Sequence, residues 1–101
     1  MSWKREQRNG IPHEVYIISG NNFVVPQSIE ISQVAPNRPF QMLYYIGDEL
    51  MCSELCMKAT SWEEARKEAR TIAQLYIEQK MAYWRRMFYH FIKVTARGER
   101  K

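Results

Sequence analysis

The fold of this chain is decided by residues 60 to 94, which read TSWEEARKEARTIAQLYIEQKMAYWRRMFYHFIKV. This stretch contains neither glycine nor proline, the two residues that most readily interrupt a helix. Basic residues gather toward its end, where they suit the negative end of a helix dipole. We therefore expect a long helix over residues 60 to 95, either continuous or bent and broken near Gln79.

The first half of this stretch has a strong helix start and one apolar face. Two overlapping capping boxes are present, Thr60 with Glu63 and Ser61 with Glu64. Apolar residues then recur at spacings of three and four, which places them on one stripe: Trp62, Ala65, Ala69, Ile72, Ala73, Tyr76 and Ile77. We expect this stripe to pack on a sheet, and its alanines allow a close approach.

The second half carries more apolar side chains than one stripe can hold, namely Met81, Tyr83, Trp84, Met87, Phe88, Tyr89, Phe91 and Ile92. An unbroken helix here would be roughly 50 Å long, whereas a compact domain of this size has a radius of gyration of about 13 Å. The helix therefore either bends, most readily around residues 78 to 80, or projects. A third interpretation is that the N-terminal segment folds over the aromatic end and covers it.

The 101 residues predict one domain with an uneven charge. The net charge of +4 belongs to the two ends, because residues 60 to 101 hold ten basic and five acidic side chains while residues 11 to 59 hold two and five. Residues 1 to 10 are expected to form a basic arm, disordered or loosely docked, with Trp3 as its apolar anchor. Residues 96 to 101 are expected to form a basic tail.

Residues 11 to 59 are predicted to be mainly β, which gives an α+β fold with a small antiparallel sheet of three to four strands. A hairpin is expected from His13–Ser19 to Phe23–Val25, followed by strands over Ile29–Val34 and Phe40–Ile46. Residues Leu50–Lys58 are predicted as a further strand, in preference to a helix capped by Asp48.

Nothing in the sequence indicates catalysis or a cofactor, so the chain is predicted not to be an enzyme. Asp48 is the only aspartate, and no glycine-rich phosphate loop, GxSxG or HExxH pattern is present. A zinc site would need the entire supply of cysteine and histidine, which is Cys52, Cys56, His13 and His90. Because Cys52 and Cys56 do not have the usual CxxC spacing, no metal is expected.

An interaction surface is the stronger prediction, because tryptophan, tyrosine, methionine and arginine are enriched at the centres of protein interfaces. The residues expected to bind a partner are Tyr83, Trp84, Arg85, Arg86, Met87, Phe88 and Tyr89. Secondary basic contacts are expected from Lys93, Arg97, Arg100 and Lys101. In this hypothesis Trp84 and Phe88 enter pockets of the partner, while Arg85 and Arg86 orient it.

The basic start SWKREQR and the stretch KMAYWRRMFYHF give the chain a resemblance to the small accessory proteins that bacteriophages direct against host machines. In type it is similar to the anti-RecBCD proteins of lambdoid phages, which bind the host recombination nuclease and alter its activity. The resemblance implies a larger host protein complex acting on DNA as the partner. It carries no individual functional residue over to this sequence.

The function expected from the sequence is therefore non-enzymatic: docking on a host nuclease or helicase complex and inhibiting or modulating it. Direct binding of single-stranded or duplex nucleic acid by the same aromatic and basic surface is the alternative. A homodimer whose helix ends cover each other is a third interpretation. No secretory signal or membrane span is recognised, so a cytoplasmic location in a bacterial host is expected.

Overall fold

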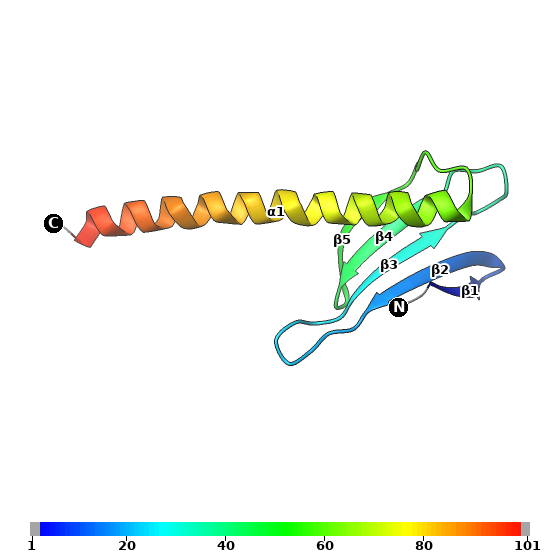
Figure 1. Cartoon of the computed structure of the whole chain (residues 1–101), viewed down its shortest axis with the longest axis horizontal. Helices are drawn as coiled ribbons and strands as arrows, with labels where there is room; N and C mark the ends of the chain where they lie inside the picture. The colour runs from blue at the N-terminus through cyan, green and yellow to red at the C-terminus, as the bar shows by residue number, and fades with distance from the viewer. Residues whose placement is uncertain (1–2, 100–101) are drawn as a thin grey trace.

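The computed structural model describes residues 3 to 99, which form a five-stranded sheet and one long helix (Figure 1). The strands are β1 (Lys4–Arg8), β2 (Ile11–Ile18), β3 (Gln27–Ser32), β4 (Gln41–Ile46) and β5 (Glu49–Glu54). The helix is α1 (Trp62–Glu99). The α+β class is confirmed, and the long C-terminal helix is confirmed with it.

The sheet has one strand more than the three to four that were expected, because the predicted N-terminal arm is an edge strand. All neighbours are antiparallel and follow the order of the chain, from β1 to β5. Asn9 and Gly10 both take positive φ, at 55° and 77°, and this tight turn folds β1 back on β2. Polar side chains concealed the strand, since an exposed edge needs no apolar alternation.

The β2–β3 connection also differs from the expected hairpin. The predicted return strand, Phe23–Val25, lies in a loop, and Gln27–Ser32 pairs with β2 instead. Asn21 organises this loop, because its side-chain oxygen accepts hydrogen bonds from the backbone N–H groups of Phe23 and Val24, at 2.8 and 3.0 Å. The result is a loop that presents Phe23 to solvent.

The last two strands were expected, but the second ends at Glu54, so residues 55 to 58 of the predicted strand lie in the connection to the helix. Phe40, Met42 and Tyr44 alternate into the core as predicted, and residues 49 to 54 form a strand rather than a helix. A register shift between Tyr44 and Tyr45 places an extra residue, Met51, in β5. This irregularity lets β5 turn Met51 toward the helix side, where it packs against the core.

The core lies between one face of the sheet and the first half of α1. Ile29, Ile31 and Met42 meet the helix from the sheet, and three alanines that are at most 4% exposed meet them from the helix: Ala65, Ala69 and Ala73. The predicted stripe is thus confirmed. Small side chains at the contact let the helix axis approach the sheet closely, so that little space is left for anything larger.

The helix begins as its sequence predicts. Ser61 is the N-cap: its hydroxyl oxygen accepts a hydrogen bond from the N–H of Glu64 at 3.2 Å, and its carbonyl accepts one from Ala65. The carboxylate of Glu64 reaches back to the N–H and hydroxyl of Thr60, and that of Glu68 accepts from Lys58 and Ala59. These bonds attach the preceding loop to the first turns.

The helix does not bend or break near Gln79, and the N-terminal segment does not cover its end. It is continuous from Trp62 to Glu99, as the absence of glycine and proline before residue 98 permits. The molecule measures 65 × 31 × 21 Å with a radius of gyration of 18.3 Å, because the second half of α1 extends past the sheet (Figure 1). Trp3 packs on Tyr16 instead, with ring centroids 5.2 Å apart.

A buried carboxylate joins β1, β2 and α1. Glu14 is 2% exposed and accepts from Arg66 of the helix at 2.6 and 2.9 Å, and from Arg5 of β1 at 2.6 Å. The guanidinium of Arg5 also lies 4.5 Å from the centre of the Trp62 ring. The Arg66 hydrogen bonds, and then those of Arg5, hold the pKa of Glu14 below its usual value of 4.5 against the effect of burial.

Within residues 3 to 99, no helix combines the length and apolar character that crossing a membrane requires.

Enlarging Ala69 should destabilise the fold, because it is fully buried where the helix meets the sheet. We expect Ala69→Leu to lower the free energy of unfolding by about 1 to 3 kcal/mol through overpacking. Ala82→Leu is the matched control on the same helix, since residue 82 is exposed. Urea denaturation followed by circular dichroism measures both, and an equal loss in the two variants would contradict this assignment of the core.

Glu14→Gln should lower the free energy of unfolding by about 1 to 3 kcal/mol at neutral pH, because two arginines lose their charged partner. The loss is smaller than for a fully buried pair, since Arg5 and Arg66 stay partly hydrated.

The same variant tests the pH dependence. A carboxylate whose pKa is lowered by folding stabilises the protein above its unfolded pKa, and this contribution disappears as the pH falls through the folded value. The difference between wild type and Glu14→Gln should therefore shrink below about pH 4.5. Thermal unfolding at several pH values measures it, and a constant difference would rule out the link.

Candidate interaction surface

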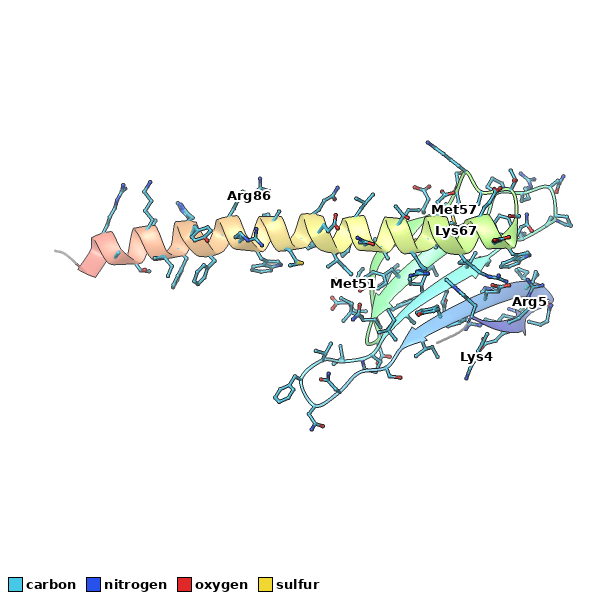
Figure 2. The ribbon with its side chains drawn as sticks, viewed as in Figure 1. Lys4, Arg5, Met51, Met57, Lys67 and Arg86 are labelled. Carbon is cyan, nitrogen blue, oxygen red and sulfur yellow. The ribbon has the colours of Figure 1, made fainter. Side chains whose placement is uncertain are left out.

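The second half of α1 forms a projecting arm, which we call the overhang and define as residues 78 to 97. Every side chain in this segment is exposed. The overhang holds five lysines and arginines and one glutamate, Glu78, which stands at its base next to the sheet. Arg86, labelled in Figure 2, lies on this part of the helix, well beyond the last strand.

Its basic residues fall mainly on one face. Arg86, His90, Lys93 and Arg97 follow one another at spacings of four, three and four residues, so they share one side of a helix with about 3.6 residues per turn. We call this set the basic stripe. No carboxylate interrupts it, because no acidic residue lies between Glu78 and Glu99 in the sequence.

Five large apolar residues and Thr95 form a second line, which we call the seam. It consists of Ile77, Met81, Trp84, Phe88, Phe91 and Thr95, at alternating spacings of four and three residues. That average of 3.5 residues is the repeat by which one helix packs along another. Trp84 and Phe91 are each 64% exposed and Phe88 is 58% exposed, so the seam has no covering element within the described chain.

An apolar groove of about 690 Å³ opens where the overhang leaves the sheet. Its walls are the end of β4, the bulge of β5 and the seam, through Ile46, Met51, Ile77, Met81, Trp84 and Phe88. A second groove of about 410 Å³ adjoins it at Ile77 and continues beside the helix over the ends of β2 and β3. The two grooves together run along the helix from Arg70 to Phe88, and the seam lines them from Ile77 onward.

The predicted partner-binding residues therefore lie together on the overhang but on different sides of it. Trp84 and Phe88 belong to the seam, Arg86 belongs to the basic stripe, and Tyr89 lies outside both. Neighbouring aromatic rings pack on each other: the ring centroids of Tyr83 and Trp84 are 5.7 Å apart, and those of Phe88 and Tyr89 are 5.9 Å apart. Of the secondary contacts, Lys93 and Arg97 are on the basic stripe, whereas Arg100 and Lys101 lie outside the described residues.

Sequence reasoning did not identify the sheet residues that complete this surface. Ile46 and Met51 form its floor, and only the bulge in β5 shows why Met51 turns toward the helix. The loop carrying Phe23, which is 95% exposed, extends from the same end of the sheet as the overhang (Figure 1). The signal available in the sequence was Phe23-Val24-Val25 beside Pro26, an apolar run too short for a paired strand.

The cysteines and histidines considered as metal ligands do not assemble. Among residues 3 to 99, no group of three or more histidine, cysteine, aspartate or glutamate side chains is placed to hold a metal ion. Cys52 and Cys56 are free thiols, and burial raises the pKa of Cys52, which disfavours its reactive thiolate.

No protein-family model, curated protein sequence or solved structure matches this chain.

Proposed function

We propose that this chain is a non-enzymatic binding protein that docks the overhang onto a larger protein. The observation that carries the proposal is the exposure of the seam along a continuous helix that stands clear of its own sheet. A helix that lays an apolar line into a groove of its partner is a recurrent mode of recognition. In this mode Trp84 and Phe88 are the anchors, since large aromatic residues contribute most to such interfaces.

The charge of the overhang favours a partner with acidic groups on its surface. Lys80 and Arg85 border the seam, whereas the basic stripe lies on the opposite side of the same helix. A groove with an apolar floor and acidic rims is complementary to this arrangement. Acidic rims would also speed the encounter, because opposite charges steer association.

We further propose that the partner is a host complex acting on DNA, such as a recombination nuclease or helicase like RecBCD, which the chain inhibits or modulates. Support for this finer statement comes from the resemblance in type to phage accessory proteins and from the basic character of the overhang. A basic helix can occupy acidic protein surfaces, but it cannot imitate the phosphate backbone of DNA.

Direct binding of nucleic acid is the second candidate, and the basic stripe is the observation that favours it. Arg86 to Arg97 covers about 16 Å along the helix, a length that brings three permanent cations near successive phosphates. Salt separates the two functions, because each phosphate contact releases counterions.

Capture from a nuclease-treated bacterial lysate tests the docking proposal. Wild-type protein should retain a stoichiometric large protein, and the double variant Trp84→Ala/Phe88→Ala should retain at least about tenfold less, because two anchors are lost. Leu55→Ala is the control, since it removes an exposed apolar side chain that follows β5 at the end of the sheet away from the overhang. Circular dichroism confirms folding, and capture that survives the double variant would contradict the proposal.

The salt dependence gives a second expectation. Protein capture through the seam should fall by less than about tenfold between 0.1 and 0.3 M salt. The affinity for nucleic acid bound through three phosphate contacts should fall by more than about tenfold over the same range. Arg86→Ala should reduce the salt slope only if phosphates are bound. Recovery of nucleic acid alone, with a steep slope that Arg86→Ala flattens, would replace the docking function by the second candidate.

A further inference from the structure

We propose that in the free protein a second copy of this chain covers the seam, with the two α1 helices packed antiparallel. The seam of one copy lies in the grooves beside the helix of the other. In this arrangement Phe88 of each copy packs at Ile77 of the other, and Met81 packs at Trp84. The structure contributes four independent observations to this inference.

The first observation is the repeat. Ile77, Met81, Trp84, Phe88, Phe91 and Thr95 keep the alternating spacing of a coiled-coil core over five intervals. The buried alanine stripe of the same helix, Ala65, Ala69 and Ala73, precedes this repeat and packs on the sheet. The repeat continues past the sheet, where the described chain supplies nothing to cover it.

The second observation is the shape of the surface beside the seam. A sheet of five strands spaced about 4.8 Å apart is roughly 20 Å across, whereas one helix is about 10 Å in diameter. The helix-facing side of the sheet is therefore only partly covered. The two grooves of about 690 and 410 Å³ mark the uncovered strip, with Met51 and Ile46 at one end and Ile18 at the other.

The third observation is charge, which selects one direction and one register. In the proposed register Glu78 of each copy lies opposite Arg85 of the other, giving two symmetric ion pairs at the edge of the seam. Shifting the helices by one heptad in either direction would place Arg85 against Arg85 or Glu78 against Glu78. A parallel, in-register pair would place Lys80 against Arg85, so it is disfavoured by like charges.

The fourth observation is area. The exposed seam residues together with Met87, Ile92 and Val94 offer roughly 700 Å² of apolar surface per copy, on the basis of about 150 to 250 Å² for each whole aromatic side chain. Stable interfaces bury about 800 Å² per partner. The pairing also leaves the basic stripe of each copy outside the contact.

The pairing would regulate the docking function proposed above. This regulatory role rests on that proposed function. The second copy and the docking partner use the same seam, so one must leave before the other binds. Self-association itself is independent of any partner. It is tested on the purified chain of 101 residues alone, so its failure is distinguishable from failure of capture.

Sedimentation equilibrium of the purified chain gives the decisive measurement. We expect a dimer whose dissociation constant rises at least about 30-fold with Trp84→Ala. Tyr89→Ala should change it less than about threefold, because Tyr89 is equally exposed, at 64%, but lies outside the seam. A monomer at about 100 μM, a concentration well above a micromolar dissociation constant, would overturn the proposal, as would a dimer equally sensitive to both changes.

Charge reversal tests the register without removing apolar surface. Arg85→Glu should weaken the dimer about tenfold, and the neighbouring control Arg86→Glu should leave it within about threefold. The double variant Glu78→Arg/Arg85→Glu restores opposite charges in the antiparallel register and should recover dimerisation. Absence of recovery in a folded double variant would overturn the antiparallel pairing.

Discussion

The close approach of α1 to the sheet at Ala65, Ala69 and Ala73 is the constraint on which the rest of the structure depends. Because these side chains are small, the helix lies directly on Ile29, Ile31 and Met42, and the direction of its axis is fixed. Larger side chains pack beside the alanines. The ring centroids of Trp62 and Phe40 are 4.9 Å apart, and those of Tyr76 and Tyr44 are 6.4 Å apart. Everything beyond Ile77 continues along an axis that these few contacts determine.

One helix therefore serves two purposes in succession. Its first half completes the core of a small sheet, and its start is attached through Ser61, Glu64 and the buried Glu14. Its second half makes no contribution to that core and carries the seam and the basic stripe. The two halves meet at Ile77, which packs against the core and is also the first residue of the seam.

The helix and its apolar stripe could be predicted from the sequence because periodicity, capping and the absence of breakers all agree. The edge strand β1 and the β2–β3 loop could not, because pairing there depends on a two-residue turn and on one asparagine, not on alternating hydrophobicity. The sequence grouped the candidate partner-binding residues in one segment but did not divide them into faces of the helix. Ile46 and Met51, which are distant in sequence from the helix, complete the candidate site, and a bulge in β5 decides the orientation of Met51.

The uninterrupted helix also has a mechanical consequence. An α-helix without a hinge bends only if its backbone hydrogen bonds are distorted, so the overhang behaves as a stiff lever roughly 30 Å long. A force applied to the helix near Arg97 would act on the contact of the three alanines with the sheet. It would also act on the ion pairs of Glu14 with Arg5 and Arg66, which join the start of the helix to β1 and β2. A small rotation at the base becomes a displacement of several ångströms at the tip, which links whatever holds the tip to the edge strand at the opposite end of the molecule.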